Sequence, residues 1–457
     1  MAKTKTTPET KTAGRFDLTE GGIVQKLLQI SLPIIGMQLM QMIYNLADMF
    51  WMGKLGTDSL AATSSVGMYL WLSIGFLTLG RMGAEIGVSQ SFGSNDRDAA
   101  HRYMTNSFMI AAVLGLAVGA AMCFARGGLV GFFNIREDNV VRLAEQYMAI
   151  SGVGIPFLFT SSVIAGAFTG SGNSRTVFYI NVIGIVFNLI LDPIMIFALD
   201  MQIAGAALSN VAGELLTFVL SLLTLYRHSD RPFHKAVLIA RPHIATIRTI
   251  LKWGLPVMME ALLFPFLSMI ITRIVAQWGA SAIAAQRIGS QAESLTWLVA
   301  AGFCTAVTSF VGQNCGAGKW KRIRRTTRLS VVMLTIYGIA VTALLYFGGG
   351  GIMRIFSPDV EVVGKGIQYL RIFSFCQLAC CYESLFAGCY RGVGHTVPPS
   401  VLSILVNVAR VIAAFVVSNT SFGLIGVYWV VSIGAVVRGL SITAGYLLYE
   451  RKLPRTD

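Results

Sequence analysis

Apolar segments of about 20 residues recur along almost the whole chain, separated by short breaks rich in Gly, Pro and charged residues. A segment of this length can cross the hydrocarbon core of a bilayer as an α-helix. The breaks predict twelve spans, at residues 25–52, 60–92, 103–125, 141–170, 176–199, 203–226, 247–276, 282–312, 328–352, 362–390, 397–418 and 423–449. We therefore expect an all-α polytopic membrane protein.

The two halves of the chain repeat each other at an offset of 223 residues, which later becomes 222. The matched pairs include Pro33 and Pro256, Gly56 and Gly279, Gln90 and Gln313, Gly93 and Gly316, Tyr147 and Tyr369, and Gly170 and Gly392. Each half holds six spans, an even number, so both halves enter the membrane from the same side. The repeat predicts two pseudo-symmetric six-helix bundles, an arrangement found in secondary transporters.

The predicted organisation follows from this repeat. A tail at residues 1–22 precedes an N-lobe at 23–227, and a connector at 228–246 leads to a C-lobe at 247–449. Residues 450–457 form a second tail. The first 22 residues are polar and lack the pattern of a cleaved signal peptide.

Composition and charge are those of a membrane protein. The chain has 457 residues, of which 54% are hydrophobic and 13% charged, and its mean hydropathy is +0.66. Its net charge of +14 comes largely from basic residues in the tails and in alternate loops, so the positive-inside rule predicts that both termini are cytoplasmic. Because this rule accounts for the charge, we expect a membrane lipid environment and no nucleic-acid partner.

One span carries candidate chemistry. Residues 181–198 are apolar enough to cross the membrane, yet they contain Asp192, followed at once by Pro193. Spacings of seven and four place Asn181, Asn188 and Asp192 on one stripe of the helix. A carboxylate at membrane depth costs about 3 kcal/mol and is typical of an ion or proton pathway. The alternative is a packing Pro beside an Asp that shares a proton or hydrogen bond with a neighbour.

A second carboxylate lies in the first span. Asp48 is four residues from the predicted end of that span and Asp192 about seven from the end of its own, a difference in depth of roughly 5 Å. In the second half the aligned residues are Ile271 and Ala414, so the two carboxylates belong to the N-lobe alone. We expect them to share a pocket, where one holds a proton or a bound cation keeps both charged.

Further residues complete the predicted site. Tyr44, Asp48, Asn181, Asn188 and Asp192 form the primary set for the coupling ion and the substrate, and Na⁺ would use Asp48, Asn188 and Asp192. Secondary candidates are Met37, Asn210, Glu214 and Thr217. Met side chains adapt to varied apolar ligands, although ordinary membrane packing explains most of the Met residues in the first span.

Other intramembrane charges have simpler explanations. Arg81 and Glu85 are one helical turn apart and predict an intrahelical ion pair. The C-lobe charges, which include Glu260, Glu293 and Arg410, contain enough opposite signs to pair with one another. Seven cysteines and five histidines show no metal-ligand spacing, and neither a DDxxD nor an HExxH motif occurs. We expect no cofactor, no metal centre and no enzymatic activity.

The motifs SLPIIGMQLMQMIYNLADMFWMGKLG, which contains Asp48, and NLILDP, which contains Asp192, resemble those of the multidrug and toxic compound extrusion (MATE) family. The resemblance is greatest to a bacterial branch named after a DNA-damage-inducible protein. It implies a monomeric two-lobe antiporter of the bacterial inner (plasma) membrane. Such a transporter exports cationic or amphipathic compounds by alternating access, against an inward flow of H⁺ or Na⁺, with H⁺ favoured.

The resemblance also assigns roles to residues. It implies that Asp48, Asn188 and Asp192 belong to the coupling site, with Asp48 as the protonated, substrate-linked carboxylate. A related branch has an acidic residue eight or nine positions after the proline of its seventh span, where this chain has Phe264 and Pro265. Coupling through the C-lobe is therefore not expected. The alternative function is a lipid-linked oligosaccharide flippase, which needs a cationic cavity for pyrophosphate.

Overall fold

The computed structural model describes residues 17–135, 137–227 and 238–454. Within these ranges every regular element is a helix. Eleven helices in this part of the chain are long and apolar enough to cross a membrane, and α12 (Val360–Ser374) with α13 (Gln377–Gly392) makes a twelfth span. The predicted all-α fold with twelve spans is confirmed.

The helices fall into two sets that follow the repeat. The first set is α2 (Ile23–Leu55), α3 (Thr57–Gly93), α4 (Arg97–Phe124), the short α5 (Arg126–Gly131), α6 (Asp138–Gly170), α7 (Ser174–Pro193), the π-helix η1 (Ile194–Ala198) and α8 (Gln202–Arg227). The second set is α9 (Ile244–Val275), the 3₁₀ turn η2 (Ala276–Trp278), α10 (Ala280–Gly316), α11 (Trp320–Phe356), α12, α13, α14 (Val397–Ser418) and α15 (Gly423–Glu450).

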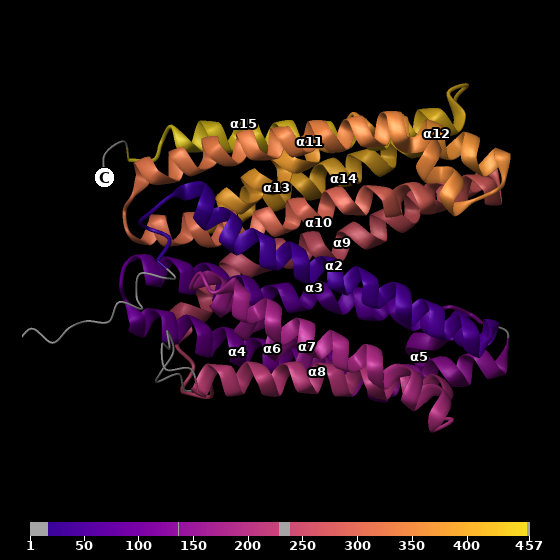
Figure 1. Cartoon of the computed structure of the whole chain (residues 1–457), viewed down its shortest axis with the longest axis horizontal. Helices are drawn as coiled ribbons and strands as arrows, with labels where there is room; N and C mark the ends of the chain where they lie inside the picture. Colours follow the sequence, from indigo (N-terminus) through magenta and orange to yellow (C-terminus); the bar gives the residue numbers. More distant parts are fainter. Residues whose placement is uncertain (1–16, 136, 228–237, 455–457) are drawn as a thin grey trace, which may run out of the picture.

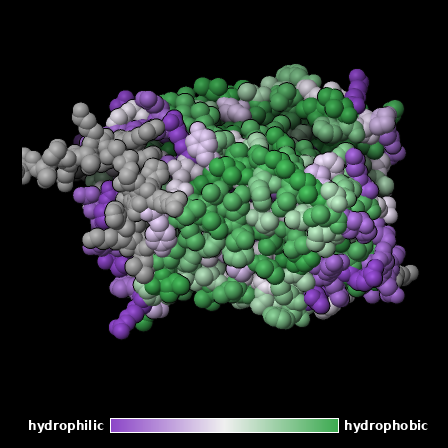
Figure 2. All heavy atoms as spheres, turned by 60° about the horizontal axis from the view of Figure 1, so that its bottom comes forward, coloured by the Kyte–Doolittle hydropathy of each residue, from purple (hydrophilic) through white to green (hydrophobic). Residues whose placement is uncertain are grey.

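The two sets form two lobes that lie side by side (Figure 1). The described chain begins and ends at the same end of the molecule, because residues near the start of α11 contact both ends: Lys319 donates to Thr19 O and Arg324 donates to Leu453 O. We call this the terminal end and the other the opposite end. Exposed apolar side chains form a broad belt between two polar ends, as expected of a protein that spans a bilayer (Figure 2).

Helix α2 belongs to both lobes. In its first half Ile23, Leu27, Ile30 and Ile34 lie on one stripe and are buried in a cluster with the C-lobe residue Phe310 and its neighbours. The helix also packs on α7 in the N-lobe, its second half reaches Asn210 of α8 through Tyr44, and Figure 1 shows it crossing between the lobes. The helix that carries Asp48 is therefore anchored at its other end in the opposite lobe.

The chain before α2 extends this anchor. Leu18, only 2% exposed, lies in the same C-lobe cluster. Its N–H donates to Gln313 Oε1 over 3.0 Å, and its carbonyl accepts from Asn314 Nδ2 over 3.2 Å. The sequence predicts residues 1–22 as a tail. In the structure Leu18 and Thr19, which belong to this tail, are held by hydrogen bonds against α10 and the start of α11 in the C-lobe.

The lobes meet near the terminal end through repeated residues. Gln90 Nε2 of α3 donates to Gly392 O over 2.9 Å, and its repeat partner Gln313 Nε2 of α10 donates to Gly170 O over 2.9 Å. Because each bond is the repeat image of the other, the interface is pseudo-twofold, as in a dimer of like subunits.

Glycines allow the two backbones to meet at this interface. An ideal Cβ on Gly93 would lie 1.8 Å from Gln313 O, and one on its repeat partner Gly316 would lie 1.9 Å from Gln90 O. No side chain fits at either position. The sequence repeat therefore predicted which residues match, and the structure shows that they join the lobes.

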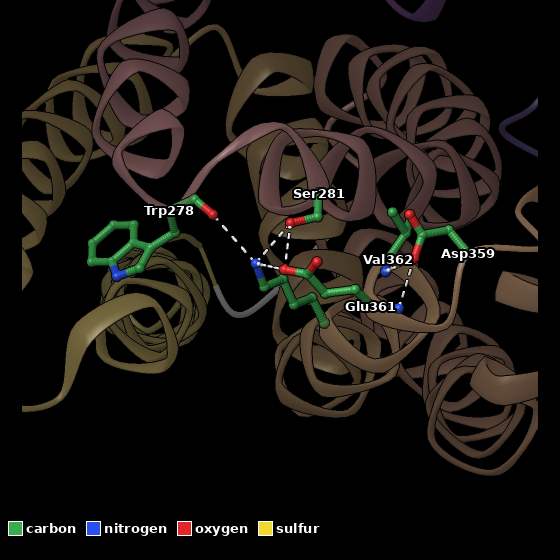
Figure 3. Close-up of polar contacts among 6 residues, drawn as sticks. Trp278, Ser281, Asp359, Glu361 and Val362 are labelled. Atoms are coloured by element: carbon green, nitrogen blue, oxygen red, sulfur yellow. Dashed lines mark hydrogen bonds and ion pairs between the residues drawn. The ribbon is translucent and has the colours of Figure 1, made fainter.

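A second pair of matched contacts lies at the opposite end. In the N-lobe Asn139 Nδ2 donates to Asp58 Oδ2 over 2.8 Å. The repeat partners are Ser281 and Glu361, and Ser281 Oγ donates to Glu361 Oε1 over 2.9 Å. Lys365 reinforces the C-lobe pair by donating to both side chains over 2.8 Å and to the Trp278 carbonyl over 3.3 Å (Figure 3). Both lobes thus fasten the start of their second span to the start of their fourth.

The tenth span is broken, whereas the sequence predicts one helix over residues 362–390. Helices α12 and α13 meet at an angle of 48°. Hydroxyls from neighbouring helices take the carbonyls at the break: Ser432 Oγ donates to Ile372 O over 3.0 Å and Thr342 Oγ1 to Ser374 O over 3.1 Å. Side chains that enter the helical hydrogen-bond ladder bend helices, and neither Gly nor Pro marks this break in the sequence.

Candidate functional site

Pro193 ends α7 and begins an unusual turn. Because proline has no N–H, it cannot donate to the carbonyl of Leu189, and its ring crowds that carbonyl. The chain continues as the π-helix η1, in which the N–H of Leu199 reaches back to Ile194 O over 2.9 Å. Single π-turns are frequent at functional sites. The disturbance that Pro193 imposes on the helix takes the form of a π-turn.

Asp192 lies at the start of this disturbance and is 0% exposed. One of its oxygens, Oδ1, accepts a hydrogen bond from Ser209 Oγ of α8. Its other oxygen, Oδ2, is buried and has no hydrogen-bond partner among the described residues. No basic residue of the described chain forms an ion pair with this carboxylate.

Asn210 joins four helices in one hydrogen-bond cluster. Its Oδ1 accepts from the Tyr44 hydroxyl of α2 and, over 2.9 Å, from Asn188 Nδ2 of α7. Its Nδ2 donates to the Tyr147 hydroxyl of α6 over 3.2 Å. Asn210, which the sequence analysis gives as a secondary candidate, is thus the centre of the cluster.

Asp48 lies one turn after Tyr44 on α2, so it shares the face of the helix that meets Asn210. Its Oδ1 is buried and lacks a hydrogen-bond partner among the described residues, as do Asn188 Oδ1 and Asp192 Oδ2. Three acceptor oxygens in one cluster without donors form a negatively polarised site. A proton or a cation would satisfy them.

The remaining predicted residues lie around this cluster. Glu214 packs against α6, where an ideal Cβ on Gly154 would lie 2.1 Å from its Oε2, and it interacts electrostatically with Tyr44. Asn181 instead donates to Val177 O of its own helix over 2.8 Å, and Thr217 donates to Gly213 O of its own helix over 2.9 Å. Met37 contacts the apolar clusters of both lobes.

The sequence did not single out Ser209 or Tyr147 as site residues. Ser209 is a single small polar residue on an apolar helix, which carries no signal by itself. Tyr147 was visible only as half of a repeat pair with Tyr369. Their roles depend on which helices are neighbours, since α8 brings Ser209 to Asp192 of α7 and α6 brings Tyr147 to Asn210 of α8.

The predicted pairing of the C-lobe charges is found only in part: among the described intramembrane charges Arg438 and Glu383 form an ion pair, whereas Glu260, Glu293 and Arg410 form none. Arg438 Nε donates to Glu383 Oε2 over 2.8 Å, and Arg438 Nη1 donates to Asn407 Oδ1 over 3.1 Å. Glu293 is buried beside Tyr369 and interacts with Arg410. These groups lie in a separate cluster from the N-lobe site.

The predicted pair of Arg81 and Glu85 is present, with 3.8 Å between Arg81 Nε and Glu85 Oε2. Glu85 is only 1% exposed and also interacts with Arg391 of α13. The pair therefore belongs to the lobe interface as well as to one helix.

A model of the MatE family matches residues 33–194 and 256–416, one segment in each lobe. The chain belongs to the MATE family. Both matched segments begin at a repeated proline, Pro33 and Pro256, so the family match follows the internal repeat. The N-lobe segment contains Asp48, Asn188 and Asp192.

Curated relatives of this MATE protein are described as multidrug transporters. The probable multidrug resistance protein NorM of Thermotoga maritima is 23% identical over 412 residues, covering 89% of this chain and 88% of that protein. The probable multidrug resistance protein YpnP of Bacillus subtilis is 26% identical and covers 85% and 87%. The multidrug export protein MepA of Staphylococcus aureus is 22% identical and covers 94% and 95%.

Solved structures share the two-lobe fold. One is described as the outward-facing conformation of a multidrug resistance MATE family transporter, with a TM-score of 0.89, 21% identity and coverage of 98% of this chain and 99% of that one. Another, a MOP superfamily transporter from Pyrococcus furiosus, also has a TM-score of 0.89 and 21% identity, with the same coverage. Its description reports a binding pocket of reverse polarity that suggests a different function.

Proposed function

We propose that this multidrug MATE transporter is an antiporter that exports cationic or amphipathic compounds. We propose further that its coupling ion binds in the N-lobe cluster, which consists of Tyr44, Asp48, Tyr147, Asn188, Asp192, Ser209 and Asn210. The observation that carries the proposal is the group of three buried acceptor oxygens without donors, on Asp48, Asn188 and Asp192. An ion that binds there and a substrate that binds another state of the protein can drive each other, because their affinities differ between states.

The coupling ion in this proposal is H⁺. A proton on one carboxyl group would let that group donate to a neighbouring oxygen, which needs no further ligand. A hard cation such as Na⁺ is held by a cage of several oxygens, and the cluster offers three that lack donors.

In this proposal the terminal end faces the cytoplasm, because its tails and loops carry most of the basic residues. The lobes are joined at that end by Gln90 and Gln313, so the structure would represent a state closed to the cytoplasm. Alternating access would separate the lobes there and bring them together at the opposite end. We expect a monomer in the bacterial inner membrane, since one chain supplies both lobes.

The test is transport of a fluorescent cation by purified protein in liposomes, with an imposed pH gradient or an imposed Na⁺ gradient. We expect the pH gradient alone to drive transport, and Asp48→Asn to abolish it, because an amide cannot exchange a proton. Asp98→Asn, which removes a carboxylate from the exposed start of α4, is the matched control and should transport normally. Full gradient-driven transport by Asp48→Asn would refute the role of Asp48.

The alternative is a flippase for lipid-linked oligosaccharides. A specific observation favours it: Arg410 in the C-lobe has a buried Nε without a hydrogen-bond partner among the described residues, and an anionic group could occupy it. The acidic N-lobe cluster favours the exporter instead. Competition of a pyrophosphate compound with the fluorescent cation, abolished by Arg410→Gln, would support the flippase.

A further inference from the structure

A groove lies between α2 and α7 in the half of the molecule next to the terminal end. Its volume is about 360 Å³, and its walls include Leu32, Pro33 and Gly36 of α2 and Arg175, Phe178 and Tyr179 of α7. None of these residues belongs to the N-lobe cluster. The groove is a separate feature of the same two helices.

The sequence explains why the helices leave this space. Pro33 cannot donate to the carbonyl of Gln29, and Ser174 Oγ at the start of α7 reaches that carbonyl at 3.5 Å instead. One turn after Pro33 the ring of Phe178 lies over Gly36, where an ideal Cβ would be 3.0 Å from Phe178 Cε2. The groove lies between these two contacts.

The groove opens on the apolar belt of the molecule. The stripe of α2 that contains Ile23, Leu27, Ile30 and Ile34 is buried in the C-lobe cluster, whereas Leu32 on another face of the helix is 59% exposed. Tyr179 on the α7 wall is 63% exposed. An occupant would therefore enter from the surrounding lipid.

The rim of the groove is basic. Arg175 is exposed in the first turn of α7, a helix of 20 residues, where the helix dipole adds positive potential. Among the described residues, no carboxylate forms an ion pair with it. The groove thus combines apolar walls with one cationic group near the edge of the apolar belt, which matches an acyl chain attached to an anionic head group.

The C-lobe shows that the fold does not require this combination. The repeat partner of Pro33 is Pro256, and α9 is also long and apolar. However, Met259 stands where the N-lobe has Gly36, and Val397 stands where it has Arg175. The C-lobe therefore has the proline but neither the glycine nor the arginine that line the N-lobe groove.

We propose that this groove binds an anionic phospholipid of the leaflet next to the terminal end, with its phosphate at Arg175 and an acyl chain along Leu32, Pro33 and Phe178. The lipid would fill the space beside the proline of the helix that carries Asp48. The proposal concerns binding and does not depend on which ion drives transport.

The test is native mass spectrometry of the purified full chain after exchange into mixed phosphatidylglycerol and phosphatidylcholine. We expect the wild-type chain to retain phosphatidylglycerol. Arg175→Ala should lower its occupancy about fivefold, since one basic side chain near an anionic lipid contributes roughly 1 kcal/mol. Arg248→Ala, which removes an exposed arginine near the same end on α9, should retain the lipid.

A second pair of variants tests the apolar part. Leu32→Trp should fill the groove and displace the lipid, whereas Leu255→Trp, at the exposed repeat partner of Leu32, should not. The proposal is overturned if both lipids bind equally, which would indicate a neutral lipid or an apolar substrate. It is also overturned if Arg175→Ala matches Arg248→Ala, or if Leu32→Trp keeps the lipid. Each readout is binding, so failure of the transport proposal would leave the result unchanged.

Discussion

At the scale of single residues, the N-lobe cluster is unusual because three of its buried oxygens accept no hydrogen bond from the described residues. Buried polar groups in proteins are nearly always hydrogen-bonded, and each one left without a partner costs about 1–3 kcal/mol. Here Asp48, Asn188 and Asp192 each have a buried oxygen without a donor in the described chain, while Asn210 beside them is bonded through both its oxygen and its nitrogen. The unsatisfied atoms are all acceptors, so the site is built to attract a positive charge.

Tyr147→Phe tests this cluster without changing a charge. The substitution removes the acceptor of Asn210 Nδ2 and leaves a buried donor unpaired, which should cost about 1–3 kcal/mol. We expect a lower Tm and at least a severalfold loss of ion-driven transport. The matched control is Tyr369→Phe at the repeat position in the C-lobe, and an equal loss of transport in both variants would contradict a specific role for Tyr147.

At the scale of elements, two helices are interrupted, and only one of the two interruptions has a cause that can be recognised in the sequence. The π-turn of η1 follows Pro193, which removes one backbone donor. The break between α12 and α13 has no such residue, and its free carbonyls are taken by hydroxyls of α11 and α15. At the break between α12 and α13 these bonds satisfy the released carbonyls, as burial in a membrane requires.

Gly205→Ala tests the packing of the π-turn. Gly205 of α8 lies against η1, and an ideal Cβ there would be 2.6 Å from Met195 O, a backbone atom that cannot rotate away. Overpacking of this kind costs about 1–3 kcal/mol, so we expect a lower Tm and weaker transport because the adjoining Asp192 must move.

The control for this variant is Gly128→Ala in α5, where no atom lies within 4 Å of an ideal Cβ. It should be neutral or slightly stabilising, since Ala is a better helix former than Gly. Unchanged thermal stability of Gly205→Ala would show that η1 tolerates displacement, contrary to the packing described.

At the scale of the whole molecule, the two lobes meet as pseudo-symmetric partners. The reciprocal bonds of Gln90 and Gln313 and the close contacts of Gly93 and Gly316 all lie near the terminal end. The buried Glu85 interacts across the same interface with Arg391. These contacts must separate if the lobes open at this end, so their strength sets how strongly the closed arrangement is favoured.

Gly93→Ala and Gly316→Ala should each open this interface. A Cβ under 2 Å from a backbone carbonyl in either variant forces α3 and α10 apart, and the pseudo-twofold arrangement predicts similar effects. The measurement is the distance distribution between spin labels at Asp98 and Arg325, exposed sites on α4 and α11, in a background without native cysteines.

Both variants should lengthen this distance relative to the unsubstituted protein. Gly53→Ala, where no atom lies within 4 Å of an ideal Cβ, should leave the distance unchanged. An unchanged distribution in both interface variants would mean that the lobes absorb the added atom without separating.

Hydrophobic periodicity and the repeat were sufficient to predict twelve spans, two lobes and the positions that match between them. These features depend on segment length and on residue spacing, which the chain carries locally. The breaks at residues 375–376 and the crossing of α2 between lobes were not predictable, because hydroxyls and apolar partners distant in sequence cause them.

The site divides in the same way. Asp48, Asn188 and Asp192 stood out because polar residues are costly inside apolar spans, and their role in ion coupling stays a prediction. Only the tertiary structure decided that Asn210 is the centre of the cluster, that Ser209 and Tyr147 complete it, and that Asn181 bonds its own helix. Spacing along one helix determines which face a residue occupies, but the packing of neighbouring helices determines what that face meets.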